Sequence, residues 1–271
     1  MSIADEQLGE RERAHLSKPS LEDPTQPTTE ESYHGLTWAQ RTAYGHLRAV
    51  LDVGDTSGRK NAYIDHLHKV ALAEALGHRR FRRALDFGCG SGRFLDFLSK
   101  RSDEVTAFDR TPEMLALAKS TRALPEENFI CGQEATLPFA EGAFDLILSV
   151  YVISCAPREN FGTLIGELGR VCEPGGVIAL VEQIDNGRGL TPRTYLDVFH
   201  HAGFEVTIGR PIRTASSTLM RWSLHPWLPS IAGQMLGRIE IDRMAAARFA
   251  PTTIGYWDYL IVAKRVTAAF P

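Results

Sequence analysis

The strongest structural signal in this chain is the stretch Ala84-Leu85-Asp86-Phe87-Gly88-Cys89-Gly90-Ser91-Gly92-Arg93-Phe94. An apolar run ends in an acid, and three glycines at alternating positions then lead into a segment with helical spacing. Such glycines allow a sharp strand-to-helix turn and let the backbone approach a ligand closely. Dinucleotide-binding chains use G-x-G-x-x-G instead, and Asp86, two residues before the first glycine, would repel a pyrophosphate. The same acid would attract a ligand that carries an ammonium group.

Composition narrows the class of protein. With 271 residues and 44% hydrophobic residues the chain can form one large α/β domain, and a net charge of −3 argues against a dedicated nucleic-acid binder. The four cysteines occur singly, without metal-ligand spacing, and are interpreted as buried free thiols. The sequence shows neither an apolar stretch of about 20 residues nor a secretion signal. We therefore expect a cytoplasmic protein without a metal site.

The run His78-Arg79-Arg80-Phe81-Arg82-Arg83 is the main basic cluster. We interpret it as a solvated connection into the first strand, because charge runs usually face water. A contact with an acidic substrate or an anionic membrane surface is the alternative.

Strand and helix patterns alternate along the chain, which predicts a mostly parallel sheet with helices on both faces. Residues 1–33 are polar and proline-containing, which predicts a disordered or loosely ordered tail before a single domain over 34–271. That domain begins with a helical cap over 34–79, with helices over 37–53 and 62–76, and has a helical insertion or lid over 214–254. The expected strands are 83–87, 105–109, 128–131, 144–151, 176–182, 204–208 and 256–263; the other helices are 92–100, 112–122, 161–171 and 192–202.

Ligands of open α/β sheets bind at the carboxyl ends of the strands. Asp86 and the glycine turn follow the first strand, and Asp109 ends the second strand, 23 residues after Asp86. A carboxylate in that position can accept hydrogen bonds from the two hydroxyls of a ribose.

Further segments follow in the order of a known family. Residues 132–139 read Gly-Gln-Glu-Ala-Thr-Leu-Pro-Phe, residues 144–149 form a buried-strand pattern, and residues 171–176 read Val-Cys-Glu-Pro-Gly-Gly. Together with the glycine stretch and Asp109, they make residues 80–185 resemble the class I S-adenosylmethionine-dependent methyltransferases, of the type 11 kind. The resemblance implies a Rossmann-like, seven-stranded, mostly parallel sheet and S-adenosylmethionine as cofactor.

The resemblance also implies a cofactor site in this chain. Arg110 and Met114 would border the adenine. Gln133 stands where the family has an acid, and its carbonyl oxygen can still accept a hydrogen bond from the adenine amine. The expected cofactor-binding residues are Asp86, Gly88, Cys89, Gly90, Asp109, Arg110, Met114, Gln133, Glu134, Ala135 and Ser149.

Methyl transfer is an in-line displacement, in which a base helps when the nucleophile holds a proton. Tyr151 after the fourth expected strand and Glu182 after the fifth are the candidate catalytic residues. Tyr63 in the cap and Trp222 in the insertion are the candidate substrate-pocket residues. The alternatives are ordinary loop polarity for the first two and helix packing for the last two.

The resemblance implies a methyltransferase that acts on an oxygen or nitrogen nucleophile of a small-molecule or glycan-like acceptor. Two alternatives are a tRNA or protein methyltransferase and a non-catalytic regulatory protein that binds S-adenosylmethionine. The acceptor atom and the oligomeric state are left open by the sequence.

Overall fold

A seven-stranded sheet forms the centre of the fold in the computed structural model, which describes residues 35–121, 124–185, 191–214, 217–225, 227, 230–246 and 256–266. The spatial order is β3-β2-β1-β4-β5-β7-β6. The strands are β1 Phe81–Phe87, β2 Ser102–Asp109, β3 Phe129–Cys131, β4 Phe144–Val150, β5 Cys172–Asp185, β6 Phe204–Thr214 and β7 Tyr256–Arg265.

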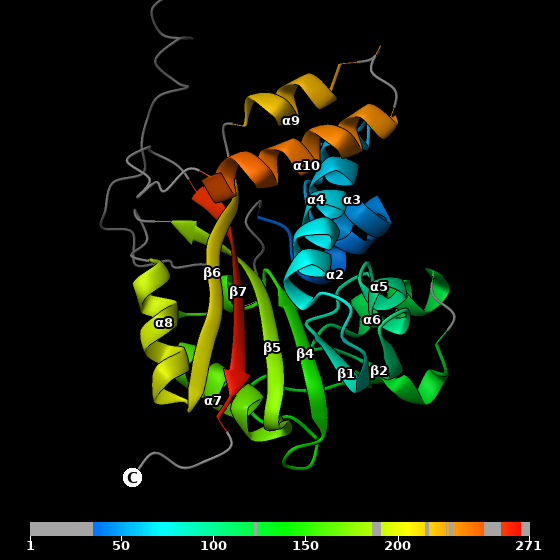
Figure 1. Ribbon diagram of the computed structural model, residues 1–271. Coiled ribbons are helices and arrows are strands. Elements are labelled where there is room, and N and C mark those ends of the chain that lie inside the picture. The colour runs from blue at the N-terminus through cyan, green and yellow to red at the C-terminus, as the bar shows by residue number, and fades with distance from the viewer. Residues whose placement is uncertain are drawn as a thin grey trace, which may run out of the picture.

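Strands β1 to β5 run parallel, and β7 lies antiparallel between β5 and β6. The sequence-based prediction of a mostly parallel sheet is therefore confirmed. Because the carboxyl ends of β1, β2 and β4 meet at one edge, the residues that follow these strands are brought together there (Figure 1).

Helices cover both faces of the sheet, as expected, and alternation along each strand supplies two hydrophobic cores. Leu146 and Leu148 of β4 face one core, and Ile147 between them faces the other. The first core packs against α4 (Arg59–Leu76), α5 (Leu95–Ser99) and α6 (Pro112–Thr121). The second packs against α7 (Phe161–Val171) and α8 (Pro192–His201).

The N-terminal cap differs from the expected pair of helices. The first expected helix, 37–53, is divided into α2 (Trp38–Arg41), a 3-10 turn (Thr42–Tyr44) and α3 (His46–Val50). The break lies at Gly45, whose φ of 80° is not helical. The buried Arg41 side chain bridges the break by donating to the carbonyl oxygens of Ala49 at 2.6 Å and Leu51 at 2.7 Å.

The helix expected over 92–100 is shorter in the structure, because the glycine turn extends to residue 94 before α5 begins. Gly92 has a φ of 76°, which a helix cannot contain. The other predicted helices agree within three residues at each end. The predicted tail, residues 1–33, lies outside the described residues.

The basic run 78–83 leads into β1 on an exposed surface. The backbone N–H groups of Arg82 and Arg83 donate to the Asp145 carboxylate at 2.7 and 2.9 Å. The Arg82 guanidinium also pairs with Glu173 at 2.6 Å. These contacts agree with a solvated connection.

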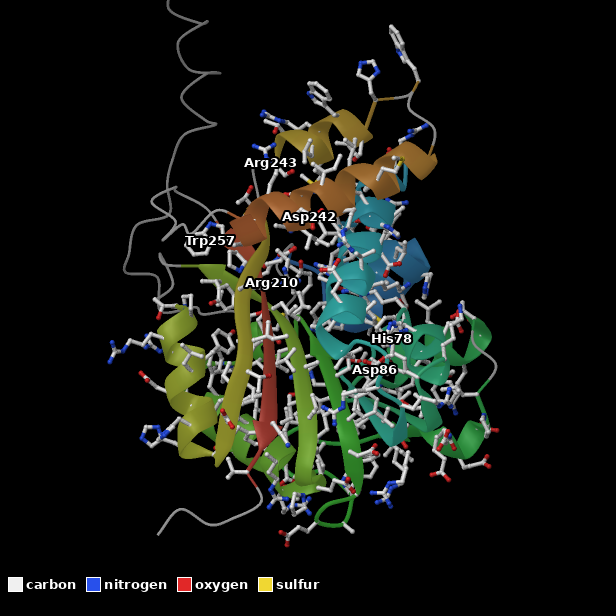
Figure 2. All side chains as sticks on the ribbon, viewed as in Figure 1. His78, Asp86, Arg210, Asp242, Arg243 and Trp257 are labelled. Carbon is white, nitrogen blue, oxygen red and sulfur yellow. The ribbon has the colours of Figure 1, made fainter. Side chains whose placement is uncertain are left out.

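The expectation that all four cysteines are buried is wrong. Cys131 and Cys155 are exposed, whereas only Cys89 and Cys172 are buried. The insertion forms α9 (Thr218–Ser223) and α10 (Ser230–Ala246), and none of its described residues lines the cavity at the carboxyl ends of β1, β2 and β4. Instead α10 packs on α4 and β6, and Figure 2 shows Asp242 and Arg243 on α10 apart from Asp86 at the end of β1.

None of the helices in the described ranges combines the length and the apolar composition that crossing a membrane requires.

Candidate active site

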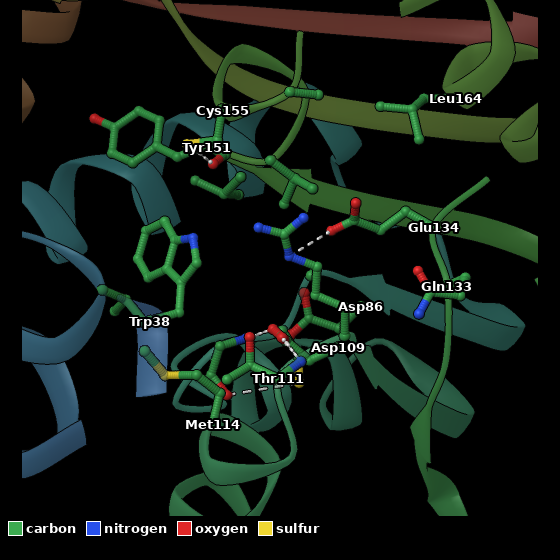
Figure 3. A pocket seen from close by; sticks show the side chains of 18 of the residues that line it. Trp38, Asp86, Asp109, Thr111, Met114, Gln133, Glu134, Tyr151, Cys155 and Leu164 are labelled. Carbon is green, nitrogen blue, oxygen red and sulfur yellow. Dashed lines mark hydrogen bonds and ion pairs between the residues drawn. The ribbon is translucent and has the colours of Figure 1, made fainter. Parts of the chain in front are cut away.

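A cavity of about 290 Å³ lies at the carboxyl ends of β1, β2 and β4 (Figure 3). It brings together most of the residues expected from the sequence. Those that line it are Asp86, Gly88, Cys89, Gly90, Asp109, Arg110, Met114, Gln133, Glu134, Ala135 and Tyr151.

The glycine turn has the backbone geometry that its sequence predicts. Gly88 and Gly90 have φ angles of 69° and 52°, in the left-handed region that favours glycine. A Cβ on Gly88 would lie 2.3 Å from Cγ2 of Val152, and one on Gly90 would lie 2.6 Å from Cγ1 of Val50. Packing as well as backbone geometry therefore excludes a side chain at both positions.

Asp109 is held in place by the turn that it faces. Its Oδ2 accepts a hydrogen bond from the Gly90 N–H at 2.8 Å, and its Oδ1 accepts one from the Thr111 N–H at 2.9 Å. Burial raises the pKa of Asp109, although these backbone bonds act to lower it. Each oxygen can accept a further hydrogen bond, so the carboxylate is oriented for a pair of hydroxyl donors.

Asp86 is almost fully buried, with 2% of its surface exposed, and its Oδ2 has no hydrogen-bond partner in the structure. Burial raises the pKa of Asp86 to about 7; Arg93 opposes that rise and Asp109 adds to it. A buried acceptor without a donor is costly unless something else supplies one. Because Asp86 lines the cavity, a ligand ammonium group fits this position.

Arg93 is a site residue that the sequence interpretation missed. It directly follows the third glycine, lines the cavity and is almost fully buried. Its Nη1 donates to Oδ1 of Asp65 at 3.2 Å, and its Nη2 lies 3.3 Å from Nδ1 of His68. Its position directly after the glycine turn could have indicated a ligand contact, because a cation beside such a turn can pair with a ligand carboxylate.

The other end of the cavity has mixed walls. Met114, which is buried on α6, offers an apolar surface. Arg110 lies 3.5 Å from Glu134 in an ion pair, and Gln133 and Ala135 complete this end. Polar edges beside an apolar surface suit a purine ring.

Comparison with known proteins agrees with this geometry. Residues 85–180 match the family model described as a methyltransferase domain. The chain carries a class I S-adenosylmethionine-dependent methyltransferase domain.

Curated relatives match part of this chain. An uncharacterized methyltransferase of Synechocystis sp. is 30% identical over 118 residues, which are 44% of this chain and 54% of the relative. A malonyl-[acyl-carrier protein] O-methyltransferase of Enterobacter lignolyticus is 34% identical over 109 residues, 40% of this chain and 42% of the relative. The chain thus spans about half the length of the curated relatives that it matches.

Solved structures share the fold at low sequence identity. The [4+2]-cyclase SpnF has a TM-score of 0.54 at 19% identity, over 75% of this chain and 81% of its own. A geranyl diphosphate C-methyltransferase of Streptomyces coelicolor, solved with S-adenosyl-L-homocysteine, has a TM-score of 0.54 at 15% identity, over 82% of this chain and 88% of its own. At these identities the likeness shows the fold alone.

Glu182 does not reach the cavity of the methyltransferase domain, so the structure does not support its expected role as a base. It is fully buried and accepts hydrogen bonds from the backbone N–H groups of Val152 at 3.3 Å, Ile153 at 3.1 Å and Ser154 at 3.0 Å. Burial raises the pKa of Glu182 to about 7. Its role is to hold the segment after β4 in place.

Tyr151 lines the cavity, but its hydroxyl lies 3.3 Å from Nε2 of His68, a residue that does not line the cavity. Burial raises the pKa of Tyr151 well above its usual value. The phenol is therefore not ionised near neutral pH and does not fit the expected role of a base. Its φ of 62° is strained for a residue with a side chain, a feature that clusters at functional sites.

Three other predicted site residues lie outside the lining of this cavity. Ser149 is buried in β4 and does not line the cavity. Tyr63 is buried and donates its hydroxyl hydrogen to Glu240 on α10. Trp222 lies on α9 with 67% of its surface exposed. Neither aromatic side chain contributes to the cavity, because the insertion packs beside α4 rather than over the site.

The wall opposite the glycine turn comes from the N-terminal cap, in which a pocket residue was expected, and from the segment after β4. The cap contributes Trp38 and Val50, and the segment after β4 contributes Val152, Cys155 and Ala156. Further along, Pro157 and Leu164 extend this apolar wall, and Asn160 and Thr163 supply its polar side chains.

Proposed function

We propose that the protein binds S-adenosylmethionine in this cavity and transfers the methyl group to an oxygen or nitrogen atom of a small, largely apolar acceptor. The observation that carries the proposal is the buried Oδ2 of Asp86, which lacks a hydrogen-bond partner beside the glycine turn. A ligand ammonium group would supply that missing donor.

The lining residues fit the parts of the cofactor in order. Asp86 would accept from the ammonium group and Arg93 would pair with the carboxylate of the methionine part. Asp109, already oriented by Gly90 and Thr111, would accept hydrogen bonds from the ribose hydroxyls. Met114 would pack against the adenine, whose polar edge would face the segment 133–135.

The acceptor would occupy the wall that includes Trp38, Val152 and Leu164. This wall is mainly apolar, so it would bind an apolar body better than a glycan with many hydroxyl groups. When bound, the cofactor supplies an electrophilic methyl group and leaves as a neutral thioether. The wall would exclude water and align the acceptor with that methyl group.

Base catalysis is not needed for every acceptor. On the described acceptor wall, no carboxylate or imidazole side chain lines the cavity, and the Tyr151 hydroxyl is bonded elsewhere. A nucleophile that need not lose a proton before it attacks, such as a carboxylate or an uncharged amine, suits this wall. Similarity to a malonyl-[acyl-carrier protein] O-methyltransferase supports an oxygen nucleophile of this kind.

Calorimetry with S-adenosylmethionine, S-adenosylhomocysteine and NAD tests the cofactor part. We expect micromolar binding of both sulfur nucleosides and none of NAD; binding of NAD alone would contradict the proposal. Transfer from methyl-labelled cofactor to matched aliphatic carboxylic acids, amines and sugars tests the acceptor part. Cofactor binding without transfer to any acceptor in a metabolite pool would contradict the acceptor part and favour a non-catalytic role or a different reaction.

A further inference from the structure

A cluster of ionisable side chains, buried except for the partly exposed Asp65, lies next to the cavity and joins four parts of the chain. It consists of Asp65 and His68 on α4, Arg93 after the glycine turn, Arg213 on β6 and Asp258 on β7. His68 and Asp258 are fully buried and are separated by 190 residues of sequence. Buried charges are costly unless they are paired, so the arrangement of partners in this cluster is tightly constrained.

His68 connects the two halves of the cluster. Its Nδ1 lies 3.3 Å from Nη2 of Arg93, and its Nε2 lies 3.0 Å from Oδ2 of Asp258. A guanidinium group can only donate, so Nδ1 must accept, and the ring proton resides on Nε2 and points to Asp258. Burial lowers the pKa of His68, as do both arginines, which keeps the ring neutral against the opposing effect of Asp258.

Arg213 fixes the far end of this chain of contacts. Its Nε donates to Oδ2 of Asp258 at 2.5 Å and its Nη2 donates to Oδ1 at 3.0 Å, a bidentate pair. Although burial acts to raise the pKa of Asp258, Arg213 and His68 hold that pKa below its usual range. Asp258 therefore stays ionised and orients the His68 ring.

We infer that the chain Arg213–Asp258–His68 positions the Arg93 guanidinium for the carboxylate of the cofactor's methionine part. Arg93 has five N–H bonds, and its contacts with Asp65 and His68 hold it from behind while its side chain lines the cavity. A long side chain that is already fixed loses less conformational entropy when it binds. This inference rests on the proposed function.

The inference predicts a difference between two ligands. S-adenosylhomocysteine carries the amino-acid part, whereas 5′-methylthioadenosine lacks it and keeps the ribose and adenine. The key variant is His68→Leu, which removes the ring's contacts with Arg93, Asp258 and the Tyr151 hydroxyl but leaves the ion pairs Arg93–Asp65 and Arg213–Asp258 intact. Calorimetry should show about tenfold weaker binding of S-adenosylhomocysteine, the scale of one hydrogen bond to a charged group. Affinity for 5′-methylthioadenosine should stay within about twofold.

Three further variants separate positioning from general stability. His68→Gln offers an amide oxygen and an N–H in place of the ring nitrogens and should restore part of the affinity. Tyr63→Phe is the matched control, because it removes a buried hydrogen bond from the same helix without touching Arg93; it should change neither affinity. Arg93→Met should cause the same selective loss, and adding His68→Leu to it should cause no further loss.

A second measurement concerns the ligand-free protein. Nitrogen-15 NMR should find His68 neutral with its proton on Nε2, and a cationic ring or an Nδ1 proton would overturn the inference. If His68→Leu does not fold, His68→Asn, which is too short to reach both partners, serves in the same comparison. Equal loss of both ligands, unchanged binding of S-adenosylhomocysteine, or additive losses in the double variant would overturn the inference alone. A wild-type protein that binds neither ligand would overturn the proposed function, and the inference with it.

Discussion

Asp86 shows how burial controls a single charge in this site. Burial raises the pKa of Asp86 from its ordinary value of 3.8 to about 7. Between these two pH values, the folded protein keeps a proton on Asp86 that the unfolded chain has lost. The stability contributed by this group is therefore present at low pH and is lost as the pH rises through about 7. Arg93 and Asp109 are the charged neighbours that oppose and add to the rise.

The first prediction follows from that proton. A ligand ammonium group pairs with ionised Asp86, so affinity for S-adenosylhomocysteine should increase as the pH rises from about 6 to about 8. Calorimetry at about pH 6.5 in buffers of different ionisation enthalpy should detect proton release on binding. Asp86→Asn should abolish both effects and raise the melting temperature at about pH 8. A wild-type affinity independent of pH would contradict this assignment.

The second prediction concerns Asp109. Asp109→Ala removes the acceptor expected to bind the ribose and should weaken S-adenosylhomocysteine binding by about 2–3 kcal/mol. It also leaves the N–H groups of Gly90 and Thr111 without their acceptor, so the free energy of unfolding should fall by about 1–3 kcal/mol. Urea unfolding and calorimetry measure the two effects separately. Unchanged cofactor affinity in a folded Asp109→Ala protein would remove the residue from the site.

At the scale of elements, the segment after β4 depends on β5. Glu182 on β5 accepts three backbone hydrogen bonds from residues 152–154, directly after the strained Tyr151. Val152, in this segment, also packs where a Cβ of Gly88 would lie. The glycine turn and the part of the opposite wall that follows β4 therefore share one support.

The third prediction tests that support. In Glu182→Gln, an NH2 group replaces one of the two acceptor oxygens and therefore faces a backbone N–H. The free energy of unfolding should fall by about 1–3 kcal/mol, which denaturant titration without any acceptor molecule can measure. A stable Glu182→Gln protein that binds cofactor normally but has lost methyl transfer would instead support a base at this position.

At the scale of the whole molecule, the insertion and the cavity are separate. Trp38 on α2 lines the cavity, whereas Trp222 on α9 is exposed and does not. Within the described residues, large exposed apolar side chains are concentrated in the insertion at Trp222, Trp227, Met235 and Ile239. The cap, rather than the insertion, closes the wall opposite the glycine turn.

The fourth prediction uses tryptophan fluorescence to test this arrangement. Binding of S-adenosylhomocysteine should change the emission of Trp38, and Trp38→Phe should remove that change. Trp222→Phe should keep it, and Trp222→Ala should alter the free energy of unfolding by less than about 0.5 kcal/mol, as at other exposed sites. Loss of the signal in Trp222→Phe would place the insertion over the cavity.

Patterns in the sequence were enough to predict the sheet, the glycine turn and most of the residues that line the cavity. These depend on short-range patterns: alternation along strands, helical spacing, and glycines whose positive φ angles no other residue adopts easily. Asp86 and Asp109 could be assigned because each directly follows or ends a strand, and parallel strands bring their carboxyl ends to one edge.

Tertiary structure alone decided which other polar and aromatic side chains reach the cavity. Glu182 also lies near a strand end, yet the N–H groups of a neighbouring segment take up its carboxylate. Tyr63 packs against α10 instead of the cavity, and Arg93 is held by His68, which Asp258 orients from 190 residues away in the chain. The spacing of residues along the chain does not reveal such partners. The cost of burying a charge or a hydroxyl is offset only by groups that folding brings together.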